Sequence, residues 1–343
     1  MQAVVKTRAG VGQVACLEWP EPDPGPGMVK IRVAATGICG TDLHIYRDEF
    51  PSRPPVVLGH EFSGEVVAVG PGVEHIRPGD RVMSELPVAP CGRCRYCKTG
   101  RVNLCIDRRG LGWSADGSFA EYMVASEPML HRVPDNLDDE EAALCEPLAV
   151  AVHGVTELTG VRACDVVYVS GPGPIGLLVA QVAKAEGAVV VLGGTTADQG
   201  RLAVGRELGI ARVLNVEEED PVALVREMTD GLGADVVFEC SGAEPAAAQG
   251  LHALRKGGRY TQMGLFGRPV RLDLDQVVVK EVRMQGVYSS TWRAWDRALR
   301  LACQGRVRLR PLISHRFPLK EWRRAFELLW RREGLKVLLL PGA

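Results

Sequence analysis

The stretch DVVYVSGPGPIGLLVAQVAKAEG, residues 165–187, limits the possible folds more than any other part of the chain. It joins a short apolar run, typical of a buried parallel strand, to a helix-like segment that Gly187 would end. Gly171, Gly173 and Gly176 form the pattern Gly-x-Gly-x-x-Gly between the two. In this position the glycines allow a tight turn, and the start of the helix offers free N–H groups to a pyrophosphate. The stretch therefore predicts an α/β domain that binds a dinucleotide.

The same alternation of strands and helices continues to about residue 290. Apolar or β-branched runs predict further strands at 188–193, 212–216, 234–242, 257–264 and 282–289. Helical segments separate them, and Asp220 and Pro221 have the residue types of an N-cap and a first helical position. Six strands with helical crossovers predict a doubly wound, parallel six-stranded sheet, which is the Rossmann arrangement.

The residues after the second of these strands bear on the choice of dinucleotide. An Asp or Glu usually stands there and accepts hydrogen bonds from the adenosine ribose, but this chain has Thr195 and Thr196. Asp198 comes late, and Arg201 follows it. A neutral hydroxyl does not repel a 2′-phosphate and Arg201 has a matching charge, although Arg201 is equally compatible with an ordinary helix surface. The sequence thus slightly favours NADP and leaves NAD open.

The first 150 residues have a different texture, with many glycines, prolines and short β-like runs such as 28–38 and 62–70. They predict a compact domain resembling a β-barrel. After residue 290 come two amphipathic helical segments and a final apolar strand, LKVLLL. We expect this tail to return to the first domain. The expected domains are therefore 1–150 with 290–343, and 151–289.

Four cysteines stand in the polar stretch CGRCRYCKTGRVNLC, at Cys91, Cys94, Cys97 and Cys105. Cys-x-x-Cys spacing lets two thiolates reach one ion, and four thiolates complete a tetrahedral zinc shell with no vacant position. We therefore expect a structural zinc that holds together a lobe at about 88–108. Surface thiols, a redox pair and an iron–sulfur cluster are the alternatives.

The length of 343 residues suggests two domains, and a composition of 46% apolar and 24% charged residues is ordinary for a globular protein. A net charge of -1 gives no indication of a nucleic acid or an anionic membrane as partner. The sequence begins like a strand rather than a signal peptide, and no apolar run approaches the roughly 18 residues of a spanning helix. We expect a cytoplasmic protein, where the ten cysteines stay reduced.

A second set of possible metal ligands comes from three distant segments. TGICGTDLHIY contains Cys39, Thr41, Asp42 and His44, VLGHEFSGEV contains His60 and Glu61, and ALCEPLAVAVHG contains Glu146 and His153. A catalytic zinc takes one Cys, one His and a carboxylate and keeps a fourth position open. Spacing alone does not establish this site, because each residue taken singly could also be a core or surface residue.

Taken together, these motifs identify a known family. GICGTDLH, GHEFSGEVVAVG, GDRV, the four cysteines, EPLAVAVH and GPGPIG make the whole chain resemble the zinc-containing medium-chain dehydrogenases. Within them it is similar to the branch of polyol and threonine dehydrogenases. The resemblance implies a GroES-like catalytic domain with a Rossmann domain, two zinc ions per chain, NAD or NADP, and a homotetramer or homodimer.

The resemblance also implies roles for individual residues. Cys39, His60 and Glu61 match the catalytic zinc ligands, and Glu146 matches a glutamate beside that zinc. Whether Glu61 or Glu146 binds the ion directly stays open. Thr41 and His44 match a relay that carries the substrate proton to solvent. Further positions match contacts to the dinucleotide, namely Pro174, Ile175, Thr195, Thr196, Arg201, Met263, Gly264, Leu265, Tyr288 and Ser289.

The activity implied is the reversible oxidation of a secondary alcohol to a ketone by hydride transfer to the nicotinamide. EPLAVAVH is closer to the polyol branch, so a small polyol or sugar alcohol is the favoured substrate. Tyr46, Arg47, Asp48 and Phe50 are candidates to line the substrate side. The alternatives are a threonine 3-dehydrogenase, a dehydrogenase of sugars, sugar phosphates or short-chain alcohols, and a nucleotide-binding sensor with an inactive site.

Overall fold

The computed structural model describes residues 1–88 and 90–342 and divides into two compact units. The first contains Met1–Glu146, Ser290–Trp295 and Ile313–Ala343, and the second contains Pro147–Ser289 and Asp296–Leu312. Ala89, in the expected zinc lobe, and Ala343 lie outside the described residues.

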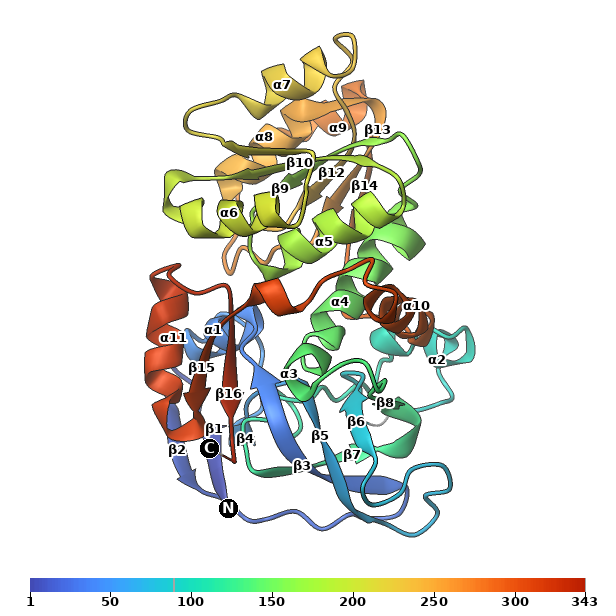
Figure 1. Ribbon diagram of the computed structural model, residues 1–343, viewed down its shortest axis with the longest axis vertical. Coiled ribbons are helices and arrows are strands. Elements are labelled where there is room, and N and C mark those ends of the chain that lie inside the picture. The colour runs from blue at the N-terminus through green and yellow to red at the C-terminus, as the bar shows by residue number, and fades with distance from the viewer. Residues whose placement is uncertain (89, 343) are drawn as a thin grey trace. The chain divides into compact units, whose positions relative to one another are not determined.

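The second unit contains a six-stranded sheet in the order β11-β10-β9-β12-β13-β14, with every strand pair parallel. Its strands are β9 Val166–Ser170, β10 Val189–Gly194, β11 Arg212–Asn215, β12 Ala234–Glu239, β13 Leu254–Gln262 and β14 Arg283–Gly286. Its helices are α5 Pro174–Ala185, α6 Gln199–Glu207, α7 Pro221–Glu227, α8 Glu244–Ala253 and α9 Asp275–Val279. Figure 1 shows α5 and α6 on one face of the sheet and α7 and α8 on the other. This arrangement confirms the predicted doubly wound sheet, whose strand order reverses between β9 and β12.

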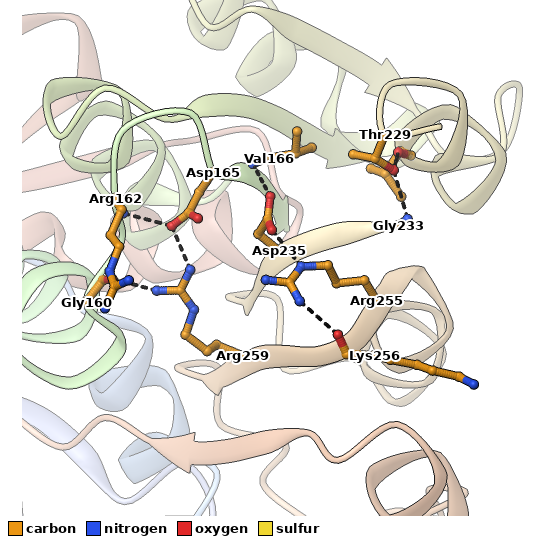
Figure 2. Close-up of polar contacts among 11 residues, drawn as sticks. Gly160, Arg162, Asp165, Val166, Thr229, Gly233, Asp235, Arg255, Lys256 and Arg259 are labelled. Atoms are coloured by element: carbon orange, nitrogen blue, oxygen red, sulfur yellow. Dashed lines mark hydrogen bonds and ion pairs between the residues drawn. The ribbon is translucent and has the colours of Figure 1, made fainter. Parts of the chain in front are cut away.

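Ion pairs at the amino ends of the central strands tie this sheet together (Figure 2). Asp165, directly before β9, accepts a hydrogen bond from the backbone N–H of Arg162 and pairs with Arg259 of β13 at 2.6 Å. Asp235 of β12 accepts the N–H of Val166 and pairs with Arg255 at 2.6 Å. These charges lie at the edge opposite to the carboxyl ends of the strands, where ligands bind in such sheets.

One segment does not follow the expected domain division. Asp296–Leu312, expected with the first domain, belongs to the second unit. The reason is a local set of polar contacts with α5. Gln181 of α5 exchanges two hydrogen bonds with the backbone of Arg308, and Arg297 pairs with Glu186 at 2.6 Å.

The first unit is rich in strands. A seven-stranded sheet has the order β15-β16-β3-β5-β6-β8, with β7 also paired to β3, and a smaller sheet has the order β2-β1-β4. The strands are β1 Gln2–Lys6, β2 Val14–Glu18, β3 Met28–Gly37, β4 Val56–Val57, β5 Glu61–Val69, β6 Arg81–Ser84, β7 Tyr122–Ser126, β8 Leu130–Arg132, β15 Ile313–Pro318 and β16 Lys336–Leu340. The final strand, β16, pairs antiparallel with β3.

The remaining helices are short or link segments of the chain. They are α1 Gly40–Tyr46, α2 Arg95–Lys98, α3 Asp139–Ala142, α4 Cys145–Val152, α10 Trp292–Cys303 and α11 Trp322–Trp330. Single turns of 3₁₀ helix occupy Val102–Leu104, Glu127–Met129, Thr196–Asp198, Arg310–Leu312 and Leu319–Glu321, and a π-helix continues α4 at His153–Thr159. Among the described residues, none of these helices has the length and apolar character needed to cross a bilayer.

The register between β3 and β5 places the first functional residues. Side chains alternate along β3, where Ile31 is buried and Arg32 is exposed, as the pleat of a strand requires. The strand ends at Gly37, which pairs with Glu61 at the start of β5. A Cβ at Gly37 would overlap the Glu61 carboxylate, so only glycine permits this approach. The register therefore brings the segment after β3 next to the first residue of β5.

Candidate functional site

Three possible metal ligands meet where β3 ends and β5 begins. Cys39 is the N-cap residue of α1, His60 directly precedes β5, and Glu61 is its first residue. One ligand atom from each residue lies within 4.8 Å of the others, and both His60 and Glu61 are buried. A thiolate, an imidazole and a carboxylate are a ligand set that a catalytic zinc uses.

Asp42 is placed to orient His60. Its Oδ2 accepts a hydrogen bond from the backbone N–H of Cys39 at 2.9 Å, and its Oδ1 faces His60 Nδ1 at 3.7 Å. Among the described residues, neither Asp42 Oδ1 nor His60 Nδ1 has a hydrogen-bond partner. Burial raises the pKa of the Asp42 carboxyl, while the nearby His60 works to lower it. A carboxylate in this position would hold the Nδ1 proton and leave Nε2 to face an ion.

Lys336 of β16 neutralises Glu61 inside the unit. Its Nζ lies 2.5 Å from Glu61 Oε2 and donates a second hydrogen bond to the carbonyl oxygen of Ile38 at 3.1 Å. Burial favours the neutral amine, but the charges of Glu61 and Cys39 outweigh it and raise the pKa of Lys336. One oxygen of Glu61 is therefore already engaged by a lysine.

Glu146, the second residue of α4, is buried close to this group but is not one of the three grouped ligands. Its Oε1 has no hydrogen-bond partner among the described residues. Burial raises the pKa of its carboxyl to about 7, against an opposing effect of His60. A buried carboxylate oxygen without a partner is costly, and a divalent ion at this point would satisfy it. The donor set and this oxygen fit a zinc ion.

The two residues expected to relay a proton lie on α1. Thr41 Oγ1 is 3.7 Å from Cys39 Sγ. His44 lies three residues further along the same helix, and a hydrogen bond of 2.7 Å joins its Nδ1 to Glu49 Oε2. The described contacts contain no hydrogen bond between Thr41 and His44, so the relay stays a prediction.

The four clustered cysteines also meet. Their sulfurs lie within 4.8 Å of one another, around the short helix α2. The backbone N–H groups of Cys97 and Ile106 lower the pKa of Cys94 to about 6, whereas burial and neighbouring thiols raise that of Cys97 to about 12. Few side chains of this lobe are buried. The cluster therefore fits a closed zinc shell that substitutes for an apolar core.

In the second unit the glycine loop connects β9 to α5. Gly171 has φ +100°, and a Cβ at Gly176 would overlap the carbonyl oxygen of Gly171. Gly173 differs from both, because a Cβ there would meet no atom within 4 Å. It is also the N-cap residue of α5 and has no side chain to cap the helix. The loop thus leaves open space and free N–H groups at the position where a pyrophosphate would bind.

Other positions expected to contact the dinucleotide follow the carboxyl ends of β13 and β14. Met263 and Gly264 donate backbone N–H groups to the carbonyl oxygen of Glu239 at 2.8 and 2.9 Å. Leu265 and Tyr288 are exposed, and the hydroxyl of Ser289 is buried without a hydrogen-bond partner among the described residues. Thr195, Thr196 and Arg201 follow β10, and Pro174 and Ile175 begin α5.

Sequence reasoning named Asp42 beside the metal ligands without giving it a role, and it missed three further residues that support these sites: Trp113, Glu239 and Lys336. Trp113 places its ring edge-on to His60, with centroids 5.6 Å apart, and Phe50 packs against the same tryptophan. Glu239, fully buried at the end of β12, accepts hydrogen bonds from Ser241 and Gln262. Of the other candidates for the substrate side, Tyr46 packs instead among Trp322, Phe326 and Trp330.

Comparisons with known proteins agree with this geometry. The family model for the alcohol dehydrogenase GroES-like domain matches residues 25–135, and that for zinc-binding dehydrogenase matches residues 174–304. A sorbitol dehydrogenase from Halalkalibacterium halodurans is 46% identical over 99% of both chains. The chain belongs to the zinc-containing medium-chain dehydrogenases.

Two further relatives of this dehydrogenase are informative. A D-arabitol-phosphate dehydrogenase from Enterococcus avium is 40% identical, over 99% of this chain and 97% of the relative. A solved zinc-binding dehydrogenase from Sinorhizobium meliloti, bound to NADP, superimposes with a TM-score of 0.89 at 34% identity and 99% coverage of both chains. The predicted family, GroES-like and Rossmann fold class, and use of zinc with NAD or NADP are confirmed.

Proposed function

We propose that this dehydrogenase oxidises a secondary hydroxyl group of a polyol to a ketone, reversibly, with a nicotinamide dinucleotide as the hydride acceptor. The observation that carries the proposal is the group formed by Cys39 and the buried His60 and Glu61, beside the unpartnered oxygen of Glu146. The similarity to a sorbitol dehydrogenase supports a polyol over other alcohols.

We assign the two metal groups different tasks. Cys39, His60 and Glu61, with Glu146 beside them, hold the catalytic ion. When bound there, zinc supplies Lewis-acid catalysis that lowers the pKa of the substrate hydroxyl. Asp42 orients His60, and Lys336 fixes Glu61. The four clustered cysteines hold the second, structural ion.

The chain's own residues then bind the dinucleotide and carry the proton. Thr41 Oγ1 receives the substrate proton and passes it toward His44, whose ring Glu49 orients through Nδ1. The N–H groups at the start of α5 bind the pyrophosphate, and Gly173 leaves room for it. The residues after β13 and β14 contact the nicotinamide half, and those after β10 contact the adenosine half.

A panel of substrates tests the proposal. Sorbitol, xylitol, butanediol, threonine and polyol phosphates are each assayed with NAD and with NADP, and we expect turnover of at least one polyol or polyol phosphate. Turnover of threonine alone would contradict the polyol assignment.

A chelator distinguishes an enzyme from a nucleotide sensor. We expect dipicolinate to abolish turnover while NADH still binds, because the metal group and the glycine loop belong to different units. Nucleotide binding without turnover of any substrate by the zinc-loaded protein would favour the sensor.

We also propose that the protein is a cytoplasmic homo-oligomer. All ten cysteines are free, and the thiolates of both metal groups have to stay reduced to bind zinc. Exposed apolar side chains gather at the outermost strand, β14, and the adjacent α9, which supports contact with a second copy.

A further inference from the structure

The loops after β10 and β11 meet at Thr196. The two strands are parallel and in register, with Gly194 opposite Asn215, so both loops leave the same edge of the sheet. The backbone N–H of Thr196 donates to Glu217 Oε2 at 2.9 Å, and Asn215 Nδ2 donates to the Thr196 hydroxyl at 2.9 Å. A carboxylate from the loop after the third strand, β11, therefore lies directly beside the end of the second, β10.

The neighbouring donors are occupied as well. The backbone N–H and the hydroxyl of Thr195 both donate to Asp198 Oδ2, at 3.1 and 2.8 Å. The other oxygen of Asp198 lies 3.4 Å from Arg201 Nη1. Arg201, the cation that the sequence offered to a 2′-phosphate, thus faces the buried carboxylate of Asp198.

This arrangement separates the two dinucleotides chemically. In a Rossmann domain the adenosine ribose lies at the end of the second strand, which here is β10. A 2′-phosphate arriving there needs free N–H donors and an unpaired cation, but it would meet the carboxylates of Asp198 and Glu217. A 2′-hydroxyl instead donates a hydrogen bond, and the carboxylate of Glu217, which accepts hydrogen bonds from Thr196, has lone pairs left to accept another.

Glu217 is ionised when it meets the ribose. Hydrogen bonds from the side chain and the backbone of Thr196 lower the pKa of its carboxyl. The side chain is exposed and therefore accessible to a ligand.

We propose that Glu217 selects NAD over NADP by standing in for the acidic residue that the end of β10 lacks. This inference rests on the proposed function and reverses the slight preference for NADP that the residue types alone indicate. It names a specificity residue on the loop after the third strand of the sheet.

Binding of nucleotide fragments tests the proposal without relying on turnover. The full-length, zinc-loaded protein is titrated with 5′-AMP and with 2′,5′-ADP in a calorimeter, and with NADH and NADPH by fluorescence. We expect the wild type to bind 5′-AMP at least about tenfold more tightly than 2′,5′-ADP, and NADH at least about tenfold more tightly than NADPH. In Glu217→Gln, which keeps the shape and removes the charge, we expect 2′,5′-ADP to bind about tenfold more tightly than to the wild type and 5′-AMP to change less than about threefold.

A neighbouring glutamate gives the matched control. Glu219 lies on the same loop but pairs with Arg212 at 3.1 Å, so Glu219→Gln should leave the ratio of the two affinities unchanged. Thermal unfolding of both variants checks that the loop is intact.

Three results would overturn the proposal. They are equal or tighter binding of 2′,5′-ADP by the wild type, an equal response of both glutamine variants, and a selective loss of 2′,5′-ADP binding in Arg201→Leu while Glu217→Gln is silent. Failure of every ligand to bind would overturn the dinucleotide site and the proposed function with it, whereas equal affinities would leave that function standing.

Discussion

Gly173 and Gly176 stand three residues apart, yet the space around them differs. A Cβ at Gly173 would meet nothing within 4 Å, while one at Gly176 would overlap the backbone of Gly171. Gly173 has an ordinary negative φ, so its lack of a side chain is not needed for the fold. Its role must therefore come from a ligand, and that of Gly176 from packing of the helix against the loop.

The two alanine variants should separate these roles. We expect Gly173→Ala to keep its stability within about 1 kcal/mol and to lose about tenfold or more in affinity for NADH. Gly176→Ala should instead destabilise the protein by about 2 kcal/mol or more, because the added methyl group has no space. Denaturant unfolding and NADH fluorescence measure the two effects. A Gly173→Ala variant that binds NADH normally would show that the pyrophosphate does not lie there.

The motifs and the family resemblance predicted which possible metal ligands come together, but not the residues that hold them. Cysteine, histidine and carboxylate are recognisable wherever they stand, whereas Asp42 and Lys336 act only through neighbours that folding supplies. A lysine inside the apolar run LKVLLL was a usable signal, because a buried ammonium needs a buried partner. Its partner, Glu61, is 275 positions away and could not be read from the pattern.

The zinc lobe shows what an element needs when it has no apolar core. Most side chains around the four cysteines are exposed, and α2 has only four residues. Such a short helix is unstable alone, so the sulfur cluster has to hold the segment together.

Removal of one sulfur should therefore unfold the lobe and little else. We expect Cys97→Ser to lower the zinc content from two ions per chain to one and to speed amide hydrogen exchange around α2, since a zinc shell needs all four thiolates. NADH binding should persist, because the glycine loop belongs to the other unit. Metal analysis and exchange mass spectrometry measure these effects, and Cys164→Ser, at an exposed cysteine outside both metal groups, is the control. Full zinc content in Cys97→Ser would contradict the assignment.

Elements with a strong local pattern were predicted well, and those placed by distant contacts were not. The apolar runs of the second unit became the central strands β9, β10 and β12, because a buried parallel strand is apolar on both faces. The segment Asp296–Leu312 begins with most of the predicted amphipathic helix α10, but that pattern does not say which unit the helix joins. Its place follows from the contacts of Arg297 and Arg308 with α5, which only the folded chain brings together.

At the scale of the whole molecule, the chemistry is divided between two parts of the chain. Both metal groups belong to the first unit, and the glycine loop with the residues after β10, β13 and β14 belongs to the second. A variant in the first unit can therefore remove a metal ion, and a variant in the second can remove the nucleotide. Measuring nucleotide binding together with turnover shows which of the two has been lost.

The outer edge of the six-stranded sheet supplies the last prediction. β14 is the terminal strand of this sheet, and the side chains of Val278, Val279 and Met284 are 73%, 63% and 41% exposed. An open strand edge beside apolar side chains favours pairing with another copy of the chain. We expect wild-type protein to have a mass that is a multiple of 37.1 kDa by light scattering, and the double variant Val279→Glu/Met284→Glu to shift toward the monomer. Val11→Glu, at an exposed valine in the first unit, should leave the mass unchanged. A wild type that is already monomeric, or a double variant of unchanged mass, would mean that this edge does not mediate assembly.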